Sequence, residues 1–205
     1  MIVKICGITR LSDALHAADH GATALGFVFW PGSPRYVAPE QAAEIIAAVS
    51  PGVTAVGVFV NETVDGIRDI VSRTGISAVQ LHGDEPSSYA GALGWPVFRA
   101  MTVDDADEAC ARWPRDTTFL VDAADPVRRG GTGSAIDWHK AAAVAREWRL
   151  VLAGGLDASN VADAIGVVRP FGVDVSSGVE DEPGVKNPDK MTRFLASARR
   201  ALEQR

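Results

Sequence analysis

Eight short apolar runs recur along the chain, and most of the segments between them have the spacing of amphipathic helices. The runs are IVKIC (2–6), ALGFVF (24–29), TAVGVFV (54–60), AVQLH (78–82), PVFRAM (96–101), TFLVDA (118–123), RLVLAG (149–154) and FGVDVS (171–176). Runs of this length are typical of buried strands. Strand–helix alternation repeated eight times predicts an α/β protein, a single (β/α)8 TIM barrel. A doubly wound open sheet is the structural alternative, which eight strands disfavour.

Three of the intervening segments carry clear helix signals. One begins at Pro39, since proline is favoured in a first turn, and another follows Asn61 and stops at Gly75. The last opens at Asn187-Pro188 and repeats apolar residues at helical spacing up to Leu202. The 205 residues are fewer than the ~250 usual for this fold. We therefore expect short connections and some stunted helices, for instance near SSYAGAL (87–93).

Polar residues alternate with apolar ones along several strands. Val3 and Ile5, for example, alternate with Lys4 and Cys6. Because successive side chains point to opposite faces, the apolar set should face the helices and the polar set the barrel interior. Burying polar groups costs free energy unless they pair or bind a ligand. Five polar residues converging in one interior therefore indicate a site: Lys4, Gln80, His82, Asp122 and Asp174.

Composition and net charge indicate in which cellular compartment the protein works and which classes of partner it can bind. A formal net charge of -6, with no basic block to offset it, argues against nucleic acid as a partner. The N-terminal MIVKICGITR has too short an apolar run for a signal peptide, and nothing resembles a membrane span. Two cysteines are too few for a disulfide framework, and no Cys/His cluster suggests zinc. We expect a cytoplasmic protein in which residues 1–205 form one domain.

Cys6 and Asp122 end predicted strands, where barrel enzymes have their active sites. A strand cysteine alone is usually a small buried apolar residue, but Lys4 on the same face favours a thiolate by lowering the thiol pKa. An aspartate at a strand end alone serves equally well as a loop cap. Near a thiolate, however, desolvation and like charge should raise its pKa, which suits a general acid. Cys110 lies in a helical pattern, DADEACARW, without site partners, and we interpret it as packing.

Three glycine-rich loops follow late strands, at 130–133, 154–155 and 176–178. Glycine lets backbone amides approach an anion closely, and barrels often bind phosphate after strands seven and eight. One such loop would indicate only a tight turn, whereas three on the same rim predict phosphate binding. Arg35 lies in the loop PGSPRYV after the second strand. Its guanidinium has the fork geometry to bind a carboxylate through two hydrogen bonds.

These residues stand in motifs that resemble phosphoribosylanthranilate isomerase. The matching segments keep the family's order over nearly the whole chain: KICGIT (4–9), GFVFWPGSPRYV (26–37), VGVFVN (56–61), VQLHGDE (79–85), the VDA…GGTG…DW run (121–138), LAGGL (152–156) and VDVSSGVE (173–180). The resemblance implies that Cys6 is the base, Asp122 the acid and Arg35 a substrate-binding residue. It places the phosphate on the backbone of Gly131, Gly133, Gly154, Gly155, Ser177 and Gly178. We expect Gln80, His82 and Asp174 to contact the same substrate.

The implied reaction is an Amadori rearrangement in tryptophan biosynthesis. It converts N-(5-phosphoribosyl)anthranilate to 1-(2-carboxyphenylamino)-1-deoxyribulose 5-phosphate by proton transfers alone. The resemblance therefore implies no metal and no cofactor, a small-molecule substrate as partner, and either a monomer or a homodimer.

Three other functions compete with this interpretation. The related histidine-pathway isomerases resemble one another in using two aspartates, so cysteine at position 6 counts against that activity. A catalytically silent barrel that binds a metabolite or serves as a scaffold is disfavoured by Cys6, Asp122 and Arg35 occurring together. A thiol hydrolase is disfavoured because no histidine motif adjoins Cys6, although His82 could be near it in space.

Overall fold

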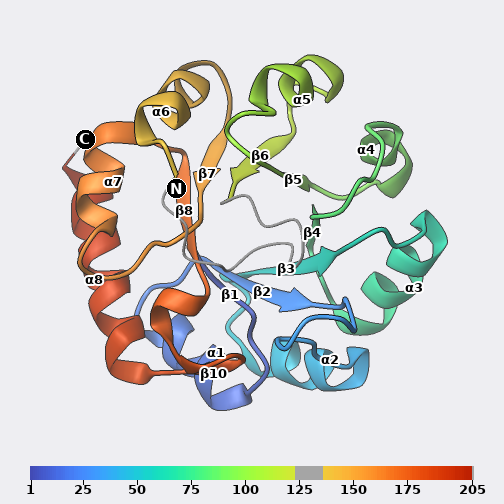
Figure 1. Ribbon diagram of the computed structural model, residues 1–205. Coiled ribbons are helices and arrows are strands. Elements are labelled where there is room, and N and C mark those ends of the chain that lie inside the picture. Colours follow the sequence, from blue (N-terminus) through green and yellow to red (C-terminus); the bar gives the residue numbers. More distant parts are fainter. Residues whose placement is uncertain (123–135, 205) are drawn as a thin grey trace.

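Eight parallel strands close into a barrel in the computed structural model, which describes residues 1–122 and 136–204 (Figure 1). The strands are β1 (Ile2–Cys6), β2 (Ala24–Val28), β3 (Thr54–Phe59), β4 (Ala78–Leu81), β5 (Val97–Met101), β6 (Thr118–Val121), β7 (Leu150–Leu152) and β8 (Gly172–Val175). Each pairs with the next, and β1 pairs with β8, so the sheet has no free edge. The prediction of a TIM barrel is confirmed, and the open sheet is excluded.

A ring of helices covers the outside of the barrel (Figure 1). They are α1 (Leu11–Asp19), α2 (Pro39–Ala48), α3 (Val64–Thr74), α4 (Ser88–Leu93), α5 (Ala106–Arg112), α6 (Trp138–Glu147), α7 (Val161–Val168) and α8 (Pro188–Glu203). The predicted signals act as expected: Gly75 ends α3 in the left-handed conformation, and the Asn187 side chain accepts a hydrogen bond from the Lys190 amide at the start of α8. Helix α4 has only 6 residues, which confirms the stunted element.

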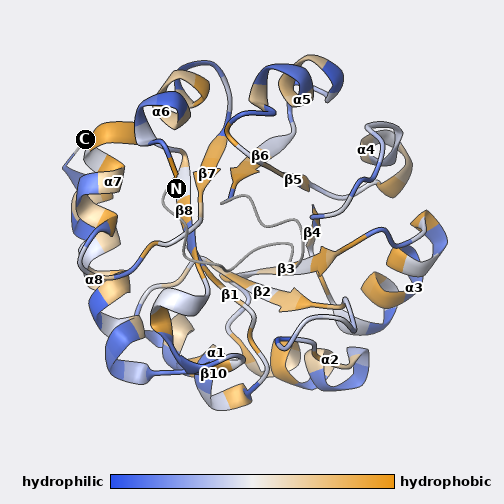
Figure 2. Cartoon of the chain, in the orientation of Figure 1, coloured by the Kyte–Doolittle hydropathy of each residue, from blue (hydrophilic) through white to orange (hydrophobic). Residues whose placement is uncertain are grey.

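Side-chain alternation along the strands produces two apolar layers. Outward residues such as Ile5, Val79 and Val173 pack with the helices in one cluster, as predicted. Figure 2 shows strands that are mostly hydrophobic and helices that carry both hydrophobic and hydrophilic residues. Inside the barrel, the expectation of a polar set is only partly right. Much of the interior is filled by a second apolar cluster: Ala24, Val56, Ala78, Phe98, Ala100, Leu120, Val151 and Ala153.

A short extension after β8 folds over the rim of the barrel beside α1 (Figure 1). It consists of a 3-10 turn, η1 (Ser177–Val179), and a two-stranded hairpin, β9 (Glu180–Glu182) and β10 (Val185–Lys186). The Lys186 amide donates to Asp13, and Arg10 donates to the Lys186 carbonyl oxygen, each over 3.0–3.2 Å. These bonds fasten the hairpin to α1 and fix its position above β1.

None of the helices in residues 1–122 and 136–204 is long and apolar enough to cross a bilayer.

Candidate active site

The carboxyl ends of the strands surround a cavity of about 740 Å³. Seven of the residues predicted from the sequence line it: Cys6, Arg35, Gln80, His82, Asp122, Asp174 and Ser177. They come from β1, β4 and β8 and from the loops after β2, β4, β6 and β8. Parallel strands bring these distant positions together because all their carboxyl ends lie at the same rim.

The six predicted phosphate-binding residues do not all line the cavity. Gly154 and Gly155 follow β7, and Gly178 lies in the turn after β8; they do not line the cavity itself. The two loops touch, since a Cβ on Gly178 would collide with the carbonyl oxygen of Leu156. The amides of Ser177 and Gly178 begin the 3-10 turn, so their N–H groups have no acceptor within it. Gly131 and Gly133 lie outside the described residues.

Cys6 is buried at the end of β1, above an ion pair inside the barrel. Lys4 Nζ lies 2.9 Å from Asp174 Oδ1, and the Lys4 side chain is completely buried. Although burial alone would lower it, the pKa of Lys4 is raised by the carboxylate of Asp174 and by the Cys6 sulfur. Lys4 is therefore a permanent cation two residues before the thiol.

The thiol pKa does not fall as the sequence suggested. Burial raises the pKa of Cys6 above its usual value, and the Asp174 carboxylate adds to this effect. The cations Lys4 and Lys186 act in the opposite direction but do not outweigh burial. The expected effect of Lys4 is present, since its charge lowers the thiol pKa, but desolvation of the thiolate is the larger effect and the net pKa is raised.

Gln80, His82 and Asp122 form a row across the cavity. Gln80 Nε2 and His82 Nδ1 are 2.9 Å apart, and His82 Nε2 lies 3.7 Å from Asp122 Oδ2. The Gln80 side-chain oxygen is buried with no hydrogen-bond partner among the described residues. Both His82 and Asp122 keep about one seventh of their side-chain surface exposed, so both can reach a molecule in the cavity.

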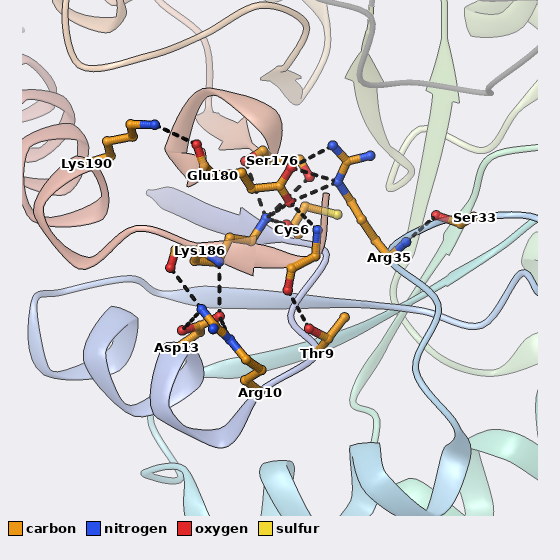
Figure 3. Close-up of polar contacts among 11 residues, drawn as sticks. Cys6, Thr9, Arg10, Asp13, Ser33, Arg35, Ser176, Glu180, Lys186 and Lys190 are labelled. Carbon is orange, nitrogen blue, oxygen red and sulfur yellow. Dashed lines mark hydrogen bonds and ion pairs between the residues drawn. The ribbon is translucent and has the colours of Figure 1, made fainter. Parts of the chain in front are cut away.

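Arg35 is already paired with a residue that the sequence analysis did not single out. Its Nη2 and Nε lie 2.7 Å and 2.9 Å from the two carboxylate oxygens of Glu180, the first residue of β9 (Figure 3). Lys186 of β10 reaches the same carboxylate at 2.7 Å and also donates to the carbonyl oxygen of Cys6. The Lys186 side chain is fully buried. A basic and an acidic residue of the hairpin thus lie directly behind the predicted base.

Sequence patterns gave little sign of Glu180 and Lys186. The segment EDEPGVK (180–186) has the composition of a solvated turn, in which charges usually face water. Glu180 ends the family-like motif VDVSSGVE, and Lys186 opens KNPDK (186–190), where many members of the family have an aspartate directly after the lysine; these positions in the resemblance were the indications for the two residues. Within the described residues, no group of three His, Cys, Asp or Glu side chains is arranged to hold a metal ion.

A closed parallel barrel whose carboxyl-terminal rim gathers a thiol, a carboxylate and an arginine is characteristic of a (β/α)8 enzyme that acts on a small anionic molecule. The family model of N-(5'-phosphoribosyl)anthranilate (PRA) isomerase matches residues 3–197. The chain belongs to this family, and it is therefore an isomerase of tryptophan biosynthesis.

Individual relatives agree over nearly the full length. N-(5'-phosphoribosyl)anthranilate isomerase from Citrifermentans bemidjiense is 47% identical over 199 residues, which are 97% of both chains. The crystal structure of the Thermotoga maritima isomerase matches with a TM-score of 0.89 and 43% identity, over 97% of this chain and 99% of that one. A structure of the isomerase with reduced 1-(o-carboxyphenylamino)-1-deoxyribulose 5-phosphate matches with a TM-score of 0.86 and 42% identity over the same shares.

Proposed function

We propose that residues 1–205 form one catalytic domain that performs the family's Amadori rearrangement with Cys6 as the base and Asp122 as the acid. The substrate is N-(5-phosphoribosyl)anthranilate and the product 1-(2-carboxyphenylamino)-1-deoxyribulose 5-phosphate. The observation that carries the assignment is that Cys6, Asp122 and Arg35 line one cavity at the carboxyl-terminal rim. Proton donor, proton acceptor and an anion-binding group are thereby within reach of a single small molecule.

Asp122 performs the first step as a general acid. It donates its proton to the furanose ring oxygen while the bond from that oxygen to the first sugar carbon breaks. The lone pair of the anthranilate nitrogen forms the new carbon–nitrogen double bond, which gives a protonated Schiff base. His82, with Nε2 3.7 Å from the Asp122 carboxylate, is placed to orient that carboxyl group and to exchange a proton with it.

Cys6 performs the second step as a thiolate. It removes the proton from the second sugar carbon, and the freed electron pair moves to the Schiff-base nitrogen to give an enolamine. The enolamine then tautomerises to the ketone, with a proton returning to the first carbon. Burial raises the thiol pKa, so the thiolate is a strong base once formed. The positive charges of Lys4 and Lys186 oppose this rise of the pKa and so favour formation of the thiolate.

The two ends of the substrate are held by different parts of the rim. The phosphate binds the backbone amides after strands six to eight, at Gly131, Gly133, Gly154, Gly155, Ser177 and Gly178. The aromatic ring then lies toward the early strands, where Arg35 binds its carboxylate. Gln80, His82 and Asp174 contact the sugar between these anchors. Fixing both ends lets binding energy serve orientation of the reacting carbon.

These steps use side-chain proton transfers only, so the proposal includes no metal and no cofactor. We further propose a cytoplasmic enzyme that acts as a monomer or a homodimer, without a nucleic-acid or membrane partner. The test is a turnover assay that follows the loss of phosphoribosylanthranilate fluorescence with purified protein. Turnover that disappears in Cys6→Ala and in Asp122→Asn supports the roles, and near-normal turnover in either folded variant contradicts them.

A further inference from the structure

A guanidinium group offers two separate faces for a carboxylate. One face consists of Nε and one hydrogen of Nη2, and the other consists of Nη1 and the second hydrogen of Nη2. In this protein the first face of Arg35 is taken by Glu180, at 2.9 Å from Nε and 2.7 Å from Nη2. Nη1 makes no hydrogen bond to any residue that the structure describes, and in Figure 3 it is turned away from Glu180. The second face therefore stays available beside the cavity.

Glu180 is a rigid partner rather than a surface charge. Its side chain is 4% exposed, and it also accepts hydrogen bonds from the Gly184 amide at 3.2 Å and from Lys186 Nζ at 2.7 Å. Despite its burial, these partners together with Arg35 hold the pKa of the Glu180 carboxyl below its usual value, so it stays ionised. Because donors on several sides hold the Glu180 carboxylate in place, it does not move with the long Arg35 side chain. The carboxylate therefore fixes the position of the Arg35 guanidinium.

Lys186 offsets the negative charge that Glu180 places beside Arg35. An arginine that is neutralised by one carboxylate attracts a second one weakly. Burial lowers the pKa of Lys186, and the carboxylate of Glu180 opposes that effect. While Lys186 is protonated, two cations face one anion, and the cluster of Arg35, Glu180 and Lys186 has a net charge of about +1. The remaining positive charge can attract an anion, while Glu180 still holds Arg35 in the same position.

The stem of Arg35 is confined as well. A Cβ on Gly7 would lie 2.6 Å from Arg35 Cδ, so the arginine stem runs directly over the residue that follows Cys6. The backbone N–H of Arg35 donates a hydrogen bond to the Ser33 hydroxyl oxygen at 3.1 Å. Stem, amide and one guanidinium face are thus all fixed before any ligand arrives, which is the arrangement expected of a preorganised binding group.

We propose that Glu180 is a positioning residue that holds the Nε/Nη2 face of Arg35 so that the Nη1/Nη2 face binds the substrate's carboxylate. This inference rests on the proposed function, in which Arg35 binds the anthranilate carboxylate. It assigns specificity for an aryl carboxylate to a pair of residues, one on the loop after β2 and one on the hairpin after β8.

The test separates position from charge. Glu180→Asp keeps the charge but shortens the side chain by one methylene, so the carboxylate no longer reaches both nitrogens. Dissociation constants are measured for reduced 1-(o-carboxyphenylamino)-1-deoxyribulose 5-phosphate and for the same molecule without its carboxyl group. Glu180→Asp should weaken binding of the carboxylate ligand about tenfold, the scale of one charge-assisted hydrogen bond, and that of the other ligand less than about twofold. The control is Glu44→Asp, the same substitution at an exposed residue of α2 that does not line the cavity, and it should leave both constants within about twofold.

Two further variants show whether Glu180 acts through Arg35. Glu180→Gln keeps the length and one acceptor, so its loss should be smaller than that of Glu180→Asp; the reverse order overturns the proposal. The double variant Arg35→Lys/Glu180→Asp should bind the carboxylate ligand about as weakly as Arg35→Lys alone. Additive losses overturn the proposal, as do equal losses for the two ligands in folded Glu180→Asp. If Arg35→Lys itself weakens both ligands equally, the proposed carboxylate contact fails first.

A measurement on the unaltered protein covers the case in which Glu180→Asp does not fold. The Arg35 Nε–H proton should exchange slowly with water, and its NMR resonance should stay nearly unchanged when the carboxylate ligand binds, since Glu180 keeps that face. A large shift with faster exchange would mean that the ligand displaces Glu180, which overturns the proposal.

Discussion

Lys4 and Asp174 are register partners on β1 and β8, the two strands that close the barrel, and their side chains form a 2.9 Å ion pair in its interior. The pair lies beneath Cys6 and borders the cavity through Asp174. It therefore links the closure of the sheet to the chemistry at the rim. A lysine at this depth is tolerated only because a carboxylate compensates its charge.

Removing the Asp174 carboxylate should strongly destabilise the protein. Asp174→Asn leaves the Lys4 ammonium buried with a neutral partner, and we expect the free energy of unfolding to fall by about 3–5 kcal/mol. Denaturant titration measures the loss. The matched control is Asp104→Asn, which removes an exposed partner of Lys140 and should cost less than about 1 kcal/mol. A loss as small as the control's would mean that Lys4 finds another partner or becomes neutral.

Cys6→Ala and Asp122→Asn should fold normally and lose most of their turnover. Each removes a group proposed to move a proton, and well-placed acids and bases contribute about 10²–10⁴-fold in rate. Steady-state assays and circular dichroism measure activity and folding together. Cys110→Ala is the control, because Cys110 is buried in α5 away from the cavity. A large loss of turnover in that variant without a loss of stability would contradict our interpretation of it as packing.

The fold could be predicted because the local pattern decides it. Strand β1 begins and ends where the run IVKIC does, and β7 is only three residues long within the predicted run RLVLAG. The alternation of apolar and polar residues correctly predicted that Val3 and Ile5 face outward, because burying their side chains against the helices is favourable. Alternation also assigns Leu120 to the inner face, but the expectation of a polar interior did not allow for the apolar side chains that fill the inside of a closed eight-stranded barrel.

The site was predictable only where a residue ends a strand. Cys6 and Asp122 fall there, so topology alone brings them to one cavity. Glu180 and Lys186 become buried through the way the hairpin folds back on α1, which depends on contacts between residues about 170 positions apart. The net rise of the thiol pKa could not be predicted for the same reason: the spacing of Lys4 and Cys6 predicts the lowering by Lys4, but the larger effect of burial is a property of the assembled barrel.

Arg35→Lys should raise the Michaelis constant about tenfold for the natural substrate, on the scale of one charge-assisted hydrogen bond of ~1.5 kcal/mol. Lysine keeps the charge but lacks the fork, so binding suffers more than proton transfer. The turnover number should therefore fall less than in Cys6→Ala. The comparison is N-(5-phosphoribosyl)aniline, which lacks the carboxylate. Equal penalties on the two substrates would show that Arg35 does not bind the carboxylate.

Lys186→Met should make the Cys6 thiol harder to ionise. Burial raises the pKa of this thiol. Of the four charged groups around it, Asp174 raises the pKa further, Lys4 and Lys186 lower it, and the Arg35 stem passes over the adjacent glycine. Removing the Lys186 cation leaves burial and Asp174 opposed mainly by Lys4, so the pKa rises. At any fixed pH less thiolate is then present.

The rate of alkylation by iodoacetamide, measured against pH in a Cys110→Ala background, should therefore reach its midpoint at higher pH in Lys186→Met than in the parent. Turnover per Michaelis constant should fall at neutral pH and recover as the pH rises, because higher pH restores the thiolate. Lys190→Met is the control: Lys190 is a partly exposed lysine that binds Asp181 and the Glu180 carbonyl oxygen at the same hairpin. It should leave the midpoint unchanged. A midpoint that stays the same in Lys186→Met, or that moves to lower pH, would show that this buried ammonium does not stabilise the thiolate and serves only to hold Glu180.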